Sequence, residues 1–199
     1  MSFSPTVDNV LSIYNNSSAE SLRTGLSWYR DAHNFAKTLD PKNVARAAGI
    51  IAALSPQSEW ENNKNKAAQL YRQNGIVTLD SEGKVGKGNG IGLPDAVKKA
   101  IRIFHGEDPL DVLKGDKVTA FYRTILNPTG DIDPVIDRHA FDIAVGERTD
   151  DKTRSRLSRK GVYDEFANVY RDAARAAGIG SAQMQAVTWV AWREILGIV

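Results

Sequence analysis

The chain has 199 residues, of which 42% are hydrophobic and 25% charged, and its formal net charge is +2 at pH 7. This length fits one domain, or one domain built of two lobes, and the small net charge argues against a globally basic nucleic-acid binder. The absence of cysteine excludes disulfides, thiolate nucleophiles and iron–sulfur clusters. No long apolar run and no secretory leader pattern occurs, so we expect a cytoplasmic protein without membrane contact.

Apolar residues at helical spacing predict helices from the start of the chain. A short amphipathic helix is expected over residues 6–14, and a longer one follows a serine cap at position 17 or 18. Asp40 precedes a proline, which suits the N-cap of another helix. Residues 44–54 are apolar on most sides, which predicts the central buried helix.

A polar break at residues 55–58 separates this helix from a lysine-bearing one over residues 60–72, for which Ser58 is the expected cap and Glu61 its partner three residues on. Glycine recurs over residues 83–92 without the spacing of a phosphate-binding loop, which favours a flexible surface loop.

The second half of the chain continues the helical pattern. Helices are expected over residues 94–104, after Asp108, from Lys117 to Leu126, after Asp137, and over 163–177 and 181–196. Turn-forming residues at 127–131 let the chain double back between Lys117 and Asp137. The charged stretch 147–160 is typical of a solvated connection. No strand pattern occurs, so the sequence predicts an all-α fold.

Asp137 and Lys117 are the first candidates for chemistry. Apolar residues flank Asp137, which places its carboxylate at the edge of packed structure, where the first backbone N–H groups of a helix favour an anion. The plain alternative is that Asp137 only caps the helix, and that Lys117 is a surface lysine. The three histidines lack metal-ligand spacing, so no metal and no cofactor are predicted.

Three segments, in order, resemble the helix-hairpin-helix DNA glycosylase superfamily. A buried helix ends in a polar tip (ALSPQSEWENNKNKAAQLY), LKGDKVTAF resembles the hairpin region, and Asp137-Arg138-His139 then precedes an apolar helix. The resemblance covers residues 40–147. It implies a two-lobed helical bundle, with residues 160–198 completing the single domain of residues 1–199.

The resemblance implies an enzyme that binds double-stranded DNA, flips a damaged or modified base and cleaves its N-glycosidic bond. Asp137 matches the aspartate that stabilises the developing sugar cation or activates the nucleophile. Lys117 matches the lysine whose amine, in some members, forms a Schiff base and leads to strand cleavage. Gln57 matches the wedge that fills the gap left by the flipped base. The other implied DNA contacts are Ser55, Ser58, Lys114, Gly115, Arg138 and His139.

The last predicted helix carries polar side chains among apolar ones. Gln183, Gln185, Trp189 and Arg193 suit a base pocket, because glutamine offers both a donor and an acceptor to a base edge. The plain alternative is that the two glutamines and the arginine satisfy buried backbone groups.

Two other functions stay open. The first is a DNA base transferase, related to viral enzymes that attach amines or amino acids to an activated 5-substituted pyrimidine. This function needs Asp137 as a base but not Lys117, and would place a viral protein in the host cytoplasm. The sequence departs from the usual hairpin by one glycine, which fits this alternative. The second is a non-catalytic DNA-binding or partner-binding helical module.

Overall fold

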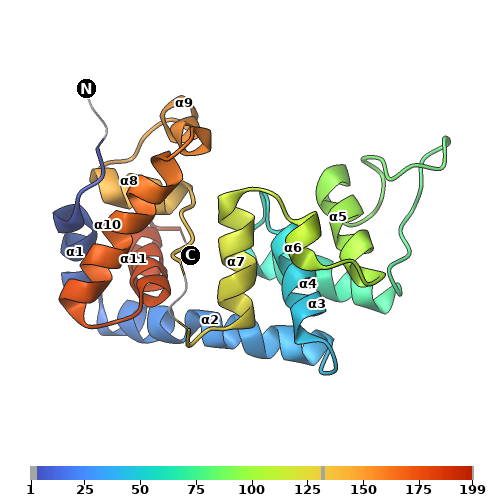
Figure 1. The fold of residues 1–199 in the computed structure, drawn as a ribbon, viewed down its shortest axis with the longest axis horizontal. Helices are drawn as coiled ribbons and strands as arrows, with labels where there is room; N and C mark the ends of the chain where they lie inside the picture. The colour runs from blue at the N-terminus through green and yellow to red at the C-terminus, as the bar shows by residue number, and fades with distance from the viewer. Residues whose placement is uncertain (1–3, 131–132, 199) are drawn as a thin grey trace. The chain divides into compact units, whose positions relative to one another are not determined.

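The computed structural model describes residues 4–130 and 133–198, and in this part of the chain every regular element is a helix (Figure 1). The all-α class predicted from the sequence is confirmed. The elements are α1 (Val7–Asn15), α2 (Ala19–Leu39), α3 (Val44–Leu54), α4 (Trp60–Arg72), α5 (Pro94–Phe104), α6 (Pro109–Val112), α7 (Asp116–Leu126), α8 (Arg138–Val145), α9 (Asp151–Arg154), the 3₁₀-helix η1 (Ser155–Ser158), α10 (Val162–Ala177) and α11 (Ser181–Ile195).

The chain divides into two compact units. The middle unit is residues 32–126, and the terminal unit is residues 1–31 together with 127–199. The first boundary falls within α2 and the second at the end of α7. The predicted break between α7 and α8 begins at Asn127, and its last residue, Asp131, lies outside the described residues.

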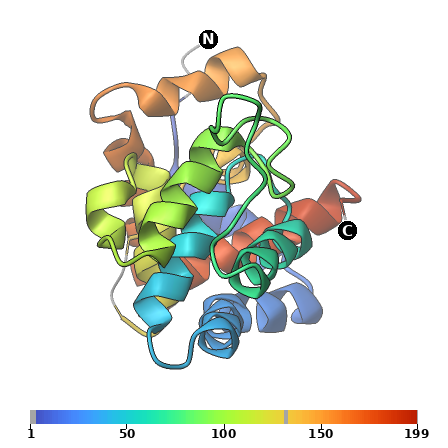
Figure 2. The same cartoon turned by 90° about the vertical axis from the view of Figure 1, so that its right-hand side faces the viewer.

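Helix α3 is the centre of the middle unit, as the sequence predicts. All of its residues from Ala47 to Leu54 are buried, and α5 and α7 pack against it (Figure 2). Gly49 lets α6 approach closely, because a Cβ atom at this position would lie 2.7 Å from the ring of Pro109. Arg46 is the only charged residue of the helix, and an otherwise apolar sequence suits a helix covered on several faces.

The start of α3 differs from the prediction. Asn43, not Asp40, caps the helix, and its side chain accepts a hydrogen bond from the backbone N–H of Arg46. Asp40 is instead buried and forms an ion pair with Arg46 at 2.6 Å, and the Tyr71 hydroxyl donates to it. Burial raises the pKa of Asp40, but the hydrogen bonds and charge of Arg46 outweigh this and lower it overall.

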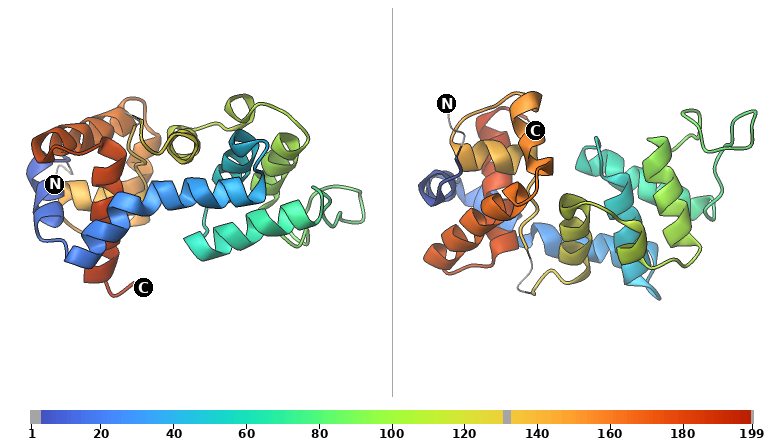
Figure 3. Two further views of the ribbon diagram at one scale, coloured as in Figure 1. Left: turned by 90° about the horizontal axis from the view of Figure 1, so that it is seen from below. Right: turned by 45° about the horizontal axis from the view of Figure 1, so that its top comes forward.

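The start of α4 also differs. Glu59 is the N-cap and makes no side-chain cap bond, so the predicted cap at Ser58 is wrong. The Ser58 hydroxyl instead accepts a hydrogen bond from the Lys66 ammonium at 3.2 Å. The segment between α4 and α5 forms turns without a helix (Figures 1 and 3). Its buried Asn89 bonds to the carbonyls of Gly86 and Gly92, so the loop has internal order.

The core of the terminal unit lies among α1, α8, α10 and α11, which contact one another (Figure 3). Its largest buried side chains include Phe141, Phe166 and Tyr170, and the two phenylalanine rings are stacked. Helix α2 approaches α11 at Gly25, where a Cβ atom would lie 2.3 Å from the Cα of Val187. Only glycine permits this contact.

The charged stretch 147–160 is more ordered than the sequence predicts. It contains α9 and η1, and Arg154 forms an ion pair with the buried carboxylate of Asp142. Thr149 adds two hydrogen bonds to the same carboxylate. Most residues of the stretch are exposed, as expected for a solvated connection, but Thr149 and Arg154 turn inward because the buried carboxylate of Asp142 requires partners.

Candidate functional site

Asp137 is the N-cap of α8, in the terminal unit. Its Oδ1 accepts hydrogen bonds from the backbone N–H groups of His139 and Ala140, at 3.0 and 2.9 Å. Pro134, Val135 and Ile136 before it are buried, and the hydroxyl of Tyr163 binds the N–H of Ile136. The carboxylate therefore sits half-buried on a fixed backbone, as expected for a cap at the edge of the core.

Helix α11 supplies the second contact to Asp137. The indole N–H of Trp189 donates to Oδ2 at 3.2 Å, so both carboxylate oxygens are engaged. The guanidinium of Arg193, one turn further along α11, lies over the Trp189 ring at 4.6 Å from its centroid. A carboxylate, an indole and a guanidinium thus meet at the junction of α8 and α11.

His139 lies behind this group, with 7% of its surface exposed. Its Nε2 is 3.3 Å from the Nε of Arg138, and its Nδ1 is buried without a hydrogen-bond partner among the described residues. Burial is the main cause that lowers the pKa of His139. The charge of Asp137 opposes this shift, and the charges of Arg138 and Arg193 add to it. The imidazole is therefore neutral near pH 7.

Tyr29 joins the site from α2, and its hydroxyl donates to Oε1 of Gln185 at 2.6 Å. Burial and then the charge of Asp137 raise the pKa of Tyr29 above its usual value, so the hydroxyl keeps its proton. Trp28 packs edge-on against Trp189, with the ring centroids 6.0 Å apart. Neither Tyr29 nor Trp28 was predicted as a site residue, because an aromatic residue within a helical pattern indicates packing rather than chemistry.

The structure brings together several residues predicted from the sequence. Asp137, His139, Trp189 and Arg193 form the group that we call the Asp137 cluster, and Arg138 and Gln185 border it. Gln185 is buried and engaged by Tyr29. Gln183 accepts a hydrogen bond from the N–H of Gly180 and so closes the start of α11.

The remaining predicted residues belong to the middle unit. Lys117 is exposed in the first turn of α7, and Lys114 and Gly115 are exposed just before it. A lysine becomes a nucleophile through burial or a cationic neighbour, and exposure removes the first of these routes. Lys117 also lies in the middle unit, whereas Asp137 lies in the terminal unit.

The polar tip after α3 also lies in the middle unit. The Ser55 hydroxyl donates to the carbonyl of Ala52 and so ends the helix. Gln57 is exposed and has a φ of 55°, a left-handed conformation uncommon for a residue with a side chain. This conformation makes the turn sharp and leaves the side chain at the surface.

The Asp137 cluster has a definite chemical capacity. Three N–H groups stabilise the negative charge of the carboxylate, which is placed to interact with a positive charge that develops beside it. The indole offers a flat apolar surface, and the guanidinium is suited to a phosphate or carboxylate. Among the described residues, no group of three or more potential ligands for a metal ion is found.

The comparisons with known proteins give one match. No curated protein and no solved structure resembles the chain significantly. Within the described residues, no helix has the length and apolar character needed to cross a membrane.

The identification as a helix-hairpin-helix DNA glycosylase is wrong, because the family model that matches is a different one. Each of the three motifs behind it includes the start of a helix, where polar residues and glycine are common in helical proteins generally. The model that matches covers residues 1–195, and the chain therefore belongs to the family of unknown function DUF7178.

Proposed function

We propose that this protein is an enzyme that acts on DNA and cleaves the N-glycosidic bond of a damaged or modified base, with Asp137 as the reacting carboxylate. The main support is the fixation of this half-buried carboxylate by three N–H donors from two helices. When a glycosidic bond breaks, positive charge develops on the sugar ring, and a fixed anion beside the ring stabilises it.

The neighbours of Asp137 suit the other parts of a nucleotide. An indole such as that of Trp189 stacks on a base, a contact worth about 1–3 kcal/mol per base. The Arg193 guanidinium, held over the same indole, is suited to a phosphate oxygen. An anion for the sugar, a flat surface for the base and a cation for the phosphate therefore lie within one cluster.

The distribution of charge supports DNA as the partner. The middle unit carries fourteen lysines and arginines against ten acidic residues, a net charge of +4, whereas the terminal unit carries twelve against fourteen. A polyanion is therefore attracted to the middle unit rather than to the unit with the Asp137 cluster. In this proposal the positive charge of the middle unit adds to the affinity for DNA.

The test is mass spectrometry of DNA after incubation with the protein. The substrates are duplex and single-stranded oligonucleotides that carry damaged bases or 5-hydroxymethyl-type pyrimidines. We expect wild type to release a free base and Asp137→Asn to release it about a hundred- to a thousand-fold more slowly. Asparagine caps helices as well as aspartate does, so this variant removes the charge and keeps α8.

The matched control is Asp133→Asn. This exposed carboxylate lies four residues earlier and pairs with Arg171 at the surface, so its loss leaves the rate unchanged. Full activity in Asp137→Asn overturns the assigned role. A gain in nucleoside mass without base release identifies a base transferase instead, and salt-dependent binding without chemistry identifies a binding module. Borohydride trapping that disappears in Lys117→Ala would assign the Schiff-base step.

A further inference from the structure

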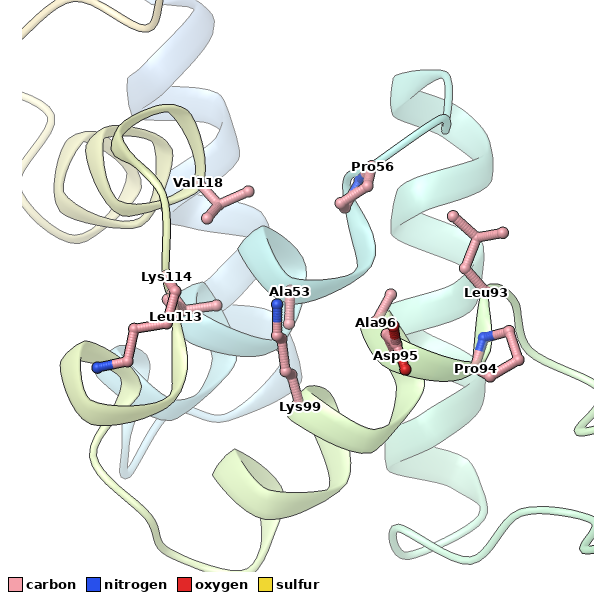
Figure 4. Close-up of a pocket in the computed structure, with 10 residues that line it drawn as sticks. All are labelled: Ala53, Pro56, Leu93, Pro94, Asp95, Ala96, Lys99, Leu113, Lys114 and Val118. Carbon is pink, nitrogen blue, oxygen red and sulfur yellow. The ribbon is translucent and has the colours of Figure 1, made fainter. Parts of the chain in front are cut away.

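A pocket of about 500 Å³ lies within the middle unit, where α3 ends, α5 begins and the chain enters α7 (Figure 4). Its wall is largely apolar and includes Ala53, Pro56, Leu93, Leu113 and Val118. Small-molecule sites have volumes of about 300–1,000 Å³ and mostly apolar walls with a few polar groups. This pocket has both properties and is separate from the Asp137 cluster.

Lys99 provides the polar group. In Figure 4 its ammonium points into the space between Ala53 and the start of α7. Lys99 is half-buried and has no ion pair or hydrogen bond to any residue that the structure describes. The acidic side chain of the wall, Asp95, does not neutralise Lys99, because it pairs with Lys98 at 3.9 Å.

Two other amines belong to the wall of the pocket or lie close to a wall residue. Lys114 belongs to the wall, although Figure 4 shows its ammonium turned away from the centre. Lys66 lies beside Gly92, where a Cβ atom would be 3.5 Å from its Nζ, and Gly92 precedes the wall residue Leu93. The pocket therefore combines an apolar interior with an excess of positive charge.

We propose that this pocket binds a small organic anion, with its apolar body against Leu113 and Val118 and its carboxylate, sulfonate or phosphate on the ammonium of Lys99. A duplex phosphate is a poorer match, because backbone phosphates are strongly hydrated and carry no apolar body for the concave wall. This site does not depend on the function proposed for Asp137.

Isothermal titration of the full chain with three naphthalene probes tests this assignment. They are 1-naphthyl phosphate, 1-naphthoate and the neutral 1-naphthol, so the ring is constant and the charge varies. We expect both anions to bind at least about tenfold more tightly than 1-naphthol, since only the anions form a hydrogen bond between two charged groups with the Lys99 ammonium. Lys99→Gln removes this difference and leaves 1-naphthol binding unchanged.

Two further variants control for folding and for general charge. Lys37→Gln removes an exposed lysine of the same unit and leaves all three affinities unchanged. Val118→Phe fills the pocket from α7 and weakens all three probes, with the thermal melting curve reporting that the variant is folded. Any of three results overturns the proposal: the anions and 1-naphthol bind equally well, neither anion binds, or Lys99→Gln has no effect on the affinities. Lys99-dependent binding of a decathymidine strand without binding of the naphthyl anions overturns it in favour of a nucleic-acid phosphate site.

Discussion

At the scale of single residues, Asp137 makes hydrogen bonds of two kinds, one local and one long-range. Its Oδ1 caps α8, a local contact that follows from an aspartate before a helix. Its Oδ2 accepts from Trp189, which is 52 residues away in the chain. The sequence predicts the first contact and not the second, because capping depends on neighbours in sequence, whereas the indole arrives only when α11 packs against α8.

His139 makes the stability of the protein depend on pH in a defined direction. Because burial lowers its pKa below the ordinary value of about 6.5, the unfolded chain binds the proton more tightly than the folded one. The contribution of His139 to stability is therefore fully present above about pH 6.5 and is lost as the pH falls toward the lowered pKa of the folded state.

Urea unfolding between pH 8 and pH 5 measures this effect. Below about pH 6.5 the unfolding free energy of wild type decreases as the pH falls, and we expect a smaller decrease in His139→Gln. The control is His105→Gln, which replaces an exposed histidine at the end of α5 and keeps the wild-type dependence. An unchanged pH dependence in His139→Gln contradicts the assignment.

At the scale of elements, the contact between α2 and α11 depends on Gly25. We expect Gly25→Ala to destabilise the protein by about 1–3 kcal/mol, as overpacking commonly does. Alanine in a helix gains about 1 kcal/mol over glycine, which opposes this loss. The clash dominates, because the new Cβ atom would lie 2.3 Å from a backbone atom of Val187, which cannot rotate away.

The shift in thermal midpoint of Gly25→Ala, compared with that of Gly88→Ala, tests this expectation. Gly88 lies in the loop between α4 and α5, and a Cβ atom there meets nothing within 4 Å. Gly88→Ala is therefore neutral or slightly stabilising. A Gly25→Ala variant as stable as wild type means that α2 and α11 are not in close contact in solution.

At the scale of the whole molecule, the opposite net charges of the two units give the proposed DNA binding a measurable signature. The logarithm of the affinity falls linearly with the logarithm of the salt concentration, with a slope set by the number of phosphates contacted. Lys114 and Lys117 are exposed in the positive middle unit. We expect Lys114→Gln with Lys117→Gln to reduce the slope by about 2, roughly one for each phosphate contact.

Fluorescence anisotropy of a labelled duplex at several salt concentrations measures this slope. The control is Lys152→Gln with Lys160→Gln, which removes two exposed lysines from the negative terminal unit. We expect this control to keep the wild-type slope. A larger loss in the control than in the middle-unit variant would place the DNA on the 147–160 stretch instead.

Several elements follow from the sequence alone. Helix α3 was predictable residue for residue, because an apolar segment between a polar start and a polar break has few alternatives. The caps were less predictable. Asp40 has the sequence signature of an N-cap, yet a buried ion pair with Arg46 uses its carboxylate instead. A local preference at a helix end is worth about 1 kcal/mol, so this ion pair and the long-range hydrogen bond from Tyr71 override it.

The sequence by itself determined the all-α class, the order of the helices and the candidacy of Asp137, because helical periodicity and capping are local properties. The family predicted from the sequence was wrong, because three local motifs resembled those of the helix-hairpin-helix DNA glycosylases and the chain belongs to another family. Only the tertiary structure decided that Trp189 binds Asp137, that Tyr29 binds Gln185, and that Lys99 points into an apolar pocket. These contacts join residues far apart in the chain, and packing between helices sets them rather than any local preference.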